Sequence, residues 1–109
     1  MKRLRKCLVD FENIPWTEVA KGARFKVYSD ENRQVRLLEF SDEYVEEDWC
    51  YRGHIGYVID GSFTTVYSDG EVEHYKVGDV IFIKSGEGEK HKVSLQKGEK
   101  VTLLIFETI

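Results

Sequence analysis

Short segments that mix apolar with polar residues run along most of this chain, and turn residues separate them. Residues 24–28 alternate charged with apolar side chains. A period of two is typical of a β-strand with one buried face. Further segments rich in β-branched and aromatic residues lie at residues 34–40, 54–60, 63–67, 71–75, 80–84, 92–95 and 101–106. The pattern therefore predicts about eight short strands.

The turn signals indicate how these strands connect. Ser68-Asp69-Gly70 lies between two of them and predicts a hairpin, because glycine accepts the positive φ that such turns need. Gly61 is expected to close the strand over residues 54–60. Helix signals are confined to residues 13–21, where one or two turns could form with Trp16 packed on the strands. Many short strands with regular turns predict a small sandwich or barrel.

Two blocks of sequence resemble the two motifs of the cupin family. Residues 54–63 (HIGYVIDGSF) are similar to the strand of the first motif, which ends in a glycine turn. Residues 78–86 (GDVIFIKSG), followed by His91, are similar to the second motif, in which a Gly-Asp turn starts a strand. Sixteen residues separate Gly61 from Gly78, close to the spacing in small cupins.

This resemblance covers about residues 34–106 and implies a fold. The expected fold is all-β, a small cupin-type double-stranded β-helix, or jelly-roll barrel, with little or no helix. Length places the whole chain, residues 1–109, in a single domain.

The resemblance also implies a metal site with unusual ligands. In the family the first motif supplies two histidines one residue apart and a glutamate seven residues before the glycine. Counted back from Gly61, the glutamate position is His54, and the two histidine positions are Asp48 and Cys50. The histidine of the second motif is His91, after a loop about two residues longer than usual. The implied ligand set is Asp48, Cys50, His54 and His91.

The physical chemistry of this set is consistent with metal binding. Asp48 and Cys50 are two residues apart, so on a strand their side chains would face the same side, with their Cα atoms about 7 Å apart. A neighbouring strand of the barrel would lie within about 5 Å, which would let His54 and His91 converge with them. Imidazole and thiolate suit a divalent transition metal ion, here zinc, iron, nickel, copper or manganese, better than magnesium or calcium. Two alternatives stay open: Cys50 as a buried, unreactive thiol, and Asp48 as the end of a solvated acidic loop.

Strand alternation also predicts what faces away from the site. Trp49 and Tyr57 are out of phase with Cys50 and His54, so they should point outward. Outward aromatic side chains on a small barrel are typical of a subunit interface or of a covering segment. Because the proteins that this chain resembles are commonly dimers, a homodimer is expected. Val58 and Phe82, on the opposite phase, should line the pocket or fill the barrel.

The two remaining candidates for chemistry receive no role in the site. His74 is expected at the surface, and Cys7 is expected to be structural or unimportant.

Composition limits the partners and the location. Sixteen Lys and Arg against 20 Asp and Glu give a net charge of −4, which argues against nucleic acid as a partner. A basic cluster near the N-terminus is interpreted as a solvated end; it comprises Lys2, Arg3, Arg5 and Lys6. No apolar run approaches the roughly 18 residues of a membrane span, so no membrane partner is expected. Two cysteines are too few for a disulfide framework, and a cytoplasmic location is the expectation.

Two hypotheses for function remain. The first is a metal-dependent enzyme that acts on an unidentified small organic substrate; by resemblance it would be an oxygenase, isomerase, epimerase or lyase. The second is a non-catalytic small-molecule-binding protein, a sensor or carrier, with or without a metal. In both, the partner is a small molecule held in the barrel.

Overall fold

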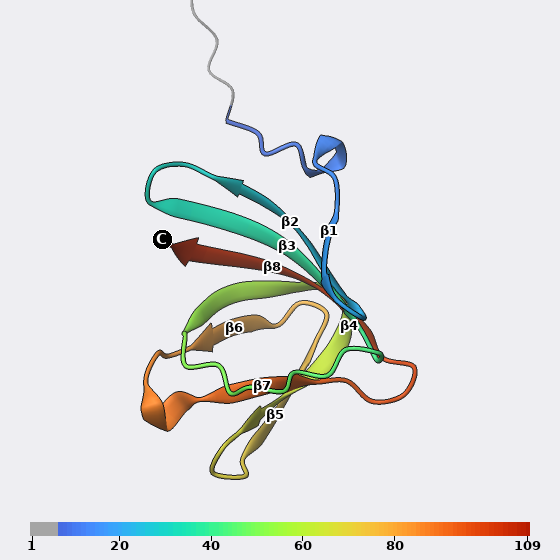
Figure 1. Cartoon of the computed structure of the whole chain (residues 1–109), viewed down its shortest axis with the longest axis vertical. Helices are drawn as coiled ribbons and strands as arrows, with labels where there is room; N and C mark the ends of the chain where they lie inside the picture. The colour runs from blue at the N-terminus through green and yellow to red at the C-terminus, as the bar shows by residue number, and fades with distance from the viewer. Residues whose placement is uncertain (1–6) are drawn as a thin grey trace, which may run out of the picture.

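The computed structural model describes residues 7–109, so the basic cluster near the N-terminus lies outside the described residues. Eight strands and two single turns of 3₁₀ helix make up the described chain (Figure 1). The strands are β1 (Thr17–Ala20), β2 (Ala23–Ser29), β3 (Arg33–Ser41), β4 (His54–Tyr67), β5 (Val72–Lys76), β6 (Val80–Ile83), β7 (His91–Ser94) and β8 (Lys100–Thr108). The turns are η1 (Phe11–Asn13) and η2 (Glu87–Glu89). Over residues 7–109, no helix has the length and apolar character needed to cross a membrane.

All strand pairs are antiparallel, and the sheet curls on itself. The strand order is β1-β2-β3-β8-β4-β5, and β6 and β7 also pair with β4. The first half of β4 pairs with β8 and β6, and its second half pairs with β5 and β7. Figure 1 shows β2, β3 and β8 as one arm and β5, β6 and β7 as the other, with β4 joining them. The predicted all-β jelly-roll architecture is confirmed.

The bend in β4 depends on one glycine. The register of β4 against β8 shifts between Val58 and Asp60, which marks a β-bulge. Gly61 follows with φ 78°, and a Cβ there would lie 1.7 Å from the carbonyl oxygen of Lys100. Only glycine fits this position. The prediction that Gly61 closes a strand is therefore wrong, because the bulge and the positive φ bend β4 without ending it.

Inward and outward side chains follow the strand period. In β6, Ile81 and Ile83 are buried, whereas Phe82, one residue out of phase, is 68% exposed. The prediction that Phe82 faces the barrel interior is therefore wrong. Val58 is fully buried and fills the core, and Tyr57 points outward as predicted, with 43% of its surface exposed.

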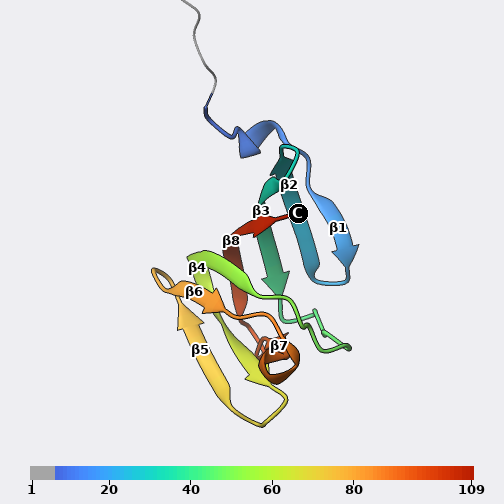
Figure 2. The same cartoon turned by 90° about the vertical axis from the view of Figure 1, so that its left-hand side faces the viewer.

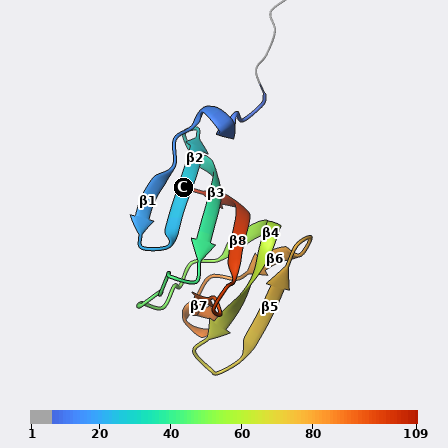
Figure 3. The same cartoon turned by 90° about the vertical axis from the view of Figure 1, so that its right-hand side faces the viewer.

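The N-terminal part of the described chain is extended. The predicted helix over residues 13–21 is wrong, since η1 is followed by the edge strand Thr17–Ala20, in which two of four residues are β-branched. Gly22, with φ 78°, allows the tight turn into β2. Trp16 packs on β2, with Arg24 Cζ 4.2 Å from the centre of its ring. Figure 3 shows β1, β2 and β3 side by side next to β8.

Candidate metal centre

A backbone bridge brings two of the predicted ligands together. Cys50 lies between β3 and β4, and His91 is the first residue of β7. The amide of Cys50 donates to the carbonyl of His91 at 2.9 Å, and the amide of His91 donates to the carbonyl of Cys50 at 3.0 Å. Two residues that exchange both bonds sit directly opposite each other, about 5.5 Å apart at Cα. His54, the first residue of β4, supplies the third side chain.

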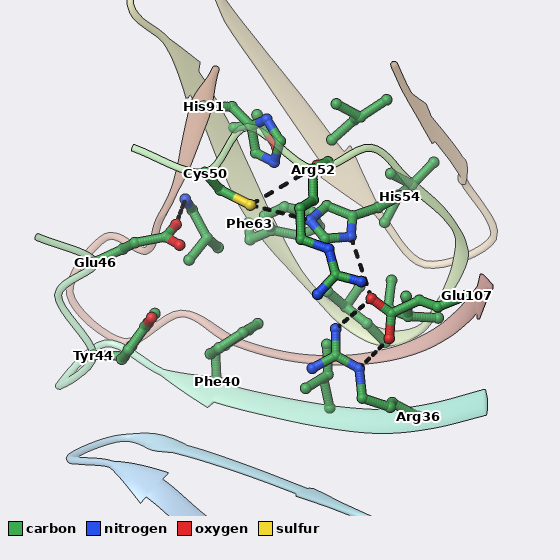
Figure 4. Close-up of a pocket in the computed structure, with 17 residues that line it drawn as sticks. Arg36, Phe40, Tyr44, Glu46, Cys50, Arg52, His54, Phe63, His91 and Glu107 are labelled. Atoms are coloured by element: carbon green, nitrogen blue, oxygen red, sulfur yellow. Dashed lines mark hydrogen bonds and ion pairs between the residues drawn. The ribbon is translucent and has the colours of Figure 1, made fainter. Parts of the chain in front are cut away.

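The three side chains converge at one point. One ligand atom from each of Cys50, His54 and His91 lies within 4.8 Å of the others. Figure 4 shows the sulfur of Cys50 beside the two imidazole rings, which meet edge to face. Cys50 Sγ is 3.7 Å from His54 Nε2. A tetrahedral zinc ion would separate a sulfur and a nitrogen ligand by about 3.6 Å, given the usual bond lengths. The spacing fits a metal ion.

His91 presents a lone pair that nothing in the described chain uses. Its ring is 5% exposed, and Nδ1 lies 2.9 Å from the carbonyl oxygen of Glu89. A carbonyl only accepts a hydrogen bond, so Nδ1 carries a proton, and in the neutral imidazole Nε2 then carries the lone pair. Nε2 is buried and, within residues 7–109, has no hydrogen-bond partner. A buried polar atom without a partner destabilises the fold, and a metal ion would satisfy it.

A carboxylate lies on the far side of the His54 ring from Cys50. Nδ1 lies 4.0 Å from Oε2 of Glu107, while Nε2 faces Cys50. Glu107 is itself fixed, because Arg36 donates to both of its oxygens and Gln34 donates to Oε1 at 2.8 Å. At 4.0 Å the two groups do not form a hydrogen bond, and Nδ1 of His54, which is buried, has no hydrogen-bond partner within residues 7–109.

The electrostatic setting keeps His54 neutral. Burial, and after it the neighbouring His91, lower the pKa of His54 to about 4, against the opposing charge of Glu107. Burial alone would raise the pKa of Glu107, but the hydrogen bonds from Arg36 and Gln34 hold it below its usual value. At neutral pH, His54 therefore has a lone pair available for a metal.

Asp48 does not join this cluster. It is exposed, and it does not line the cavity beside the three ligands. The segment before Cys50 is irregular, so the strand alternation that would align Asp48 with Cys50 is absent. Glu46, in the same acidic segment, is half-buried and accepts a hydrogen bond from the amide of Val93 at 2.7 Å. Burial raises the pKa of Glu46.

The three ligand candidates line a cavity of about 260 Å³. This volume lies just below the roughly 300–1,000 Å³ of pockets for drug-sized ligands, so the cavity fits a small molecule. Apolar side chains form much of its wall, among them Leu38, Phe40, Phe63, Val93, Leu103 and Ile105. Besides the ligand candidates, the polar and charged lining consists of Arg36, Tyr44, Glu46, Arg52, Thr65 and Glu107 (Figure 4).

The other residues considered from sequence lie outside this cavity. His74, on β5, is exposed as predicted, with Nδ1 3.0 Å from the hydroxyl of Thr64. Cys7 is exposed. Trp49 is half-buried, with Lys92 Nζ 4.6 Å from the centre of its ring, so its outward face is partly covered.

A curled antiparallel sheet around such a cavity is the fold of the small cupins, and this chain has that fold. The RmlC-like cupin from Shewanella frigidimarina superposes with a TM-score of 0.72 and 15% identity, over 95% of this chain and 91% of that chain.

Two further solved structures show the same fold. The polyketide cyclase RemF from Streptomyces resistomycificus matches with a TM-score of 0.76 and 22% identity, over 99% of this chain and 79% of that chain. KdgF from Halomonas sp. matches with a TM-score of 0.71 and 18% identity, over 94% and 93% of the two chains. No protein-family model and no curated protein matches the sequence.

Proposed function

We propose that this protein is a metal-dependent enzyme that acts on a small organic substrate. Cys50, His54 and His91 would hold one divalent transition metal ion at the wall of the cavity. The observation that carries the proposal is the buried Nε2 of His91, which is unprotonated and has no partner among the described residues. A sulfur and two nitrogens suit zinc, iron, nickel or copper.

The chemistry of the site follows from its surroundings. With three protein ligands, a bound ion would keep a position open for water or substrate and would polarise an oxygen atom there. The apolar wall keeps bulk water away, which strengthens electrostatic interactions inside the cavity. Glu46 lines the same cavity, and only one of its oxygens is hydrogen-bonded within residues 7–109, so it is the side chain best placed to accept a proton.

The structural neighbours support this class of function by analogy. RemF is described as a polyketide cyclase, an enzyme, so the fold accommodates catalysis on organic molecules. At 22% identity this is a likeness of fold, and the site residues of this chain carry the argument.

Elemental analysis of purified protein tests the metal. We expect about one transition metal ion per folded wild-type chain. His54→Ala and His91→Ala should lose most of it, whereas His74→Ala, on the exposed histidine, should retain it. Metal content should also fall as the pH drops toward the pKa of His54 at about 4, because protonated imidazole does not coordinate. Wild-type content in both ligand variants would rule out this ligand set.

A non-catalytic binding role is the second candidate, and the largely apolar lining of the cavity favours it. Native mass spectrometry separates the two. A metal-free protein that carries an organic molecule from the cell would favour the binding role over the enzyme.

We also propose that the protein is a homodimer. Five outward side chains form two adjoining rows across β8, β4 and β6: Ile55 pairs with Phe106 and Phe82, and Tyr57 pairs with Val80. Each is between 43% and 68% exposed. Monomeric proteins rarely expose a continuous apolar patch of this kind. This outer patch lies on β8, β4 and β6, which are neighbours in Figure 2, and it would bind the same patch of a second copy.

A further inference from the structure

The wall of the cavity away from the metal centre is made largely of hydrocarbon. Apolar side chains of β3, β4, β6, β7 and β8 contribute to it, and three of them, Ile81, Leu103 and Ile105, are at most 4% exposed. A molecule that enters this part of the cavity moves its own apolar surface out of water, which favours binding. Apolar area on the ligand is therefore what this wall selects.

Two aromatic side chains of the wall are held in place by stacking. Phe63, on β4, is 4% exposed and stacks on Tyr75, with the ring centres 5.1 Å apart and the planes at 15°. Phe40, on β3, stacks on Tyr44, with the ring centres 4.9 Å apart and the planes at 22°. Figure 4 shows Phe40 and Tyr44 on the side of the cavity away from His91. Rings fixed in this way contact an aromatic ligand more favourably than an aliphatic ligand of the same size.

The charged side chains around the cavity are balanced without a ligand, since two arginines and two glutamates line it. Arg36 donates through Nε to one oxygen of Glu107 and through Nη2 to the other at 2.9 Å, so this pair is internally neutral. Glu46 accepts a hydrogen bond from the amide of Val93, and Arg52 is exposed, so water solvates its charge. A charged ligand would lose its hydration at the apolar wall without gaining a partner there, which is unfavourable.

The volume of the cavity limits the size of the ligand. An apolar cavity of about 150 Å³, lined by leucine, isoleucine and phenylalanine, binds one benzene molecule. The cavity of this protein measures about 260 Å³ and is lined by the same residue types. It therefore holds one ring with several further heavy atoms, or two fused rings.

We propose that the molecule bound in this cavity is an uncharged aromatic compound of one or two rings, held against Phe40 and Phe63. The ring system occupies the apolar wall, which leaves a hydroxyl or carbonyl substituent to face the three ligand candidates. As a statement about a substrate, the inference rests on the proposed metal-dependent function. The binding itself requires only the cavity.

Calorimetric titration of the full chain, both zinc-loaded and metal-free, tests this class of ligand. The probes are naphthol, its saturated analogue decahydronaphthol, and naphthoate, all substituted on the same carbon atom. In both states naphthol should bind about threefold to tenfold more tightly than decahydronaphthol, because the two share a skeleton and a hydroxyl and differ in aromatic contacts. In metal-free protein, where no ion attracts a carboxylate, naphthoate should bind at least about tenfold more weakly than naphthol.

A pair of matched variants tests the placement of the ring. Phe40→Leu keeps the wall apolar and removes one aromatic ring, so it should bind naphthol about threefold to tenfold more weakly and decahydronaphthol as wild type does. Phe106→Leu makes the same substitution on β8, at an exposed position that does not line the cavity, and should match wild type for all three probes. Wild-type affinity for naphthol in Phe40→Leu would overturn the placement against Phe40.

The wild-type titrations decide the inference even where Phe40→Leu does not fold. Equal affinity for naphthol and decahydronaphthol would overturn the aromatic class, and tighter binding of naphthoate to metal-free protein would overturn the uncharged class. The proposed function is tested separately, because zinc content is measured on the same samples. Wild type that takes up no zinc refutes the metal-dependent function, and the metal-free titration then still decides the class of ligand.

Discussion

Cys50 and His91 face each other across a backbone bridge in which each residue donates its amide to the carbonyl of the other. The sulfur and the imidazole are therefore held by main-chain geometry, even though Cys50 lies in an irregular segment. A ligand pair fixed in this way loses little conformational entropy when a metal binds. The bridge explains how a chain with Asp48 and Cys50 at the two histidine positions of the first motif can still present a compact ligand set.

The first prediction concerns the reactivity of Cys50. A thiolate bound to a metal has its lone pairs engaged, so iodoacetamide should label Cys50 slowly in metal-loaded protein. Removal of the metal by a chelator should expose a nucleophilic thiol beside two imidazoles, and labelling should become at least several-fold faster. Peptide-resolved mass spectrometry follows each cysteine separately. Cys7, which is exposed, serves as the internal control and should react at the same rate in both states. Equal rates at Cys50, in protein that stays folded by circular dichroism, would leave it as a core thiol.

Much of the fold could be predicted from sequence, because strand alternation and turn glycines are local signals. Where these signals are missing, prediction failed. In β6, residues 80–83 are all apolar, so the sequence gives a strand without indicating which side chains face inward, and Phe82 was misplaced. The edge strand β1 is exposed along its whole length, so no buried face marks it.

The site was predictable to a similar degree. The spacing to Gly61 and the family motifs pointed to Cys50, His54 and His91, and the structure brings these three together. Glu46 could not be found in this way. Its burial depends on a hydrogen bond to Val93, a contact between distant parts of the chain that no local pattern records. The only sequence signal for Glu46 was that it lies an even number of residues before Cys50, and Asp48 does so too.

The second prediction is a loss of stability of the metal-free protein in acid. The pKa of His54 is about 4 in the folded chain, below the 6.5 of an unperturbed histidine, so as the pH falls the unfolded chain takes up this proton before the folded chain does. His54 therefore leaves the free energy of unfolding unaffected above pH 6.5 and lowers it progressively as the pH falls from 6.5 to 4. The expected loss between pH 7 and pH 5 is about 2 kcal/mol. Urea unfolding at the two pH values should show it in wild type and not in His54→Gln.

His74→Gln is the matched control for this experiment. His74 is exposed, so its replacement should leave the pH dependence of wild type unchanged. A wild-type pH dependence in His54→Gln would show that the acid sensitivity arises elsewhere.

The third prediction tests the bend in β4. Gly61→Ala places a Cβ against the carbonyl of Lys100 at a positive φ, so both a clash and backbone strain result. Gly70, with φ 95°, has no atom within 4 Å of the same position, so Gly70→Ala measures the strain alone. We expect Gly61→Ala to cost at least about 2 kcal/mol more in free energy of unfolding than Gly70→Ala. Similar unfolding midpoints for the two variants would mean that β4 bends without needing glycine.

The last prediction concerns the outer patch of Ile55, Tyr57, Val80, Phe82 and Phe106. Phe82 is its most exposed member, at 68%. In a two-fold dimer each patch meets its own copy, so a single substitution acts twice. Phe82→Glu would place two carboxylates in an apolar interface, where desolvation and like-charge repulsion both oppose association. Light scattering at micromolar concentration should give twice the chain mass of 12.7 kDa for wild type and one chain mass for Phe82→Glu.

Val72→Glu is the matched control for this experiment. It changes a similarly exposed apolar residue on β5, outside the outer patch, and should remain dimeric. A wild-type protein that stays monomeric at much higher concentration would rule out the dimer. A dimer that Phe82→Glu leaves intact would move the interface to another face.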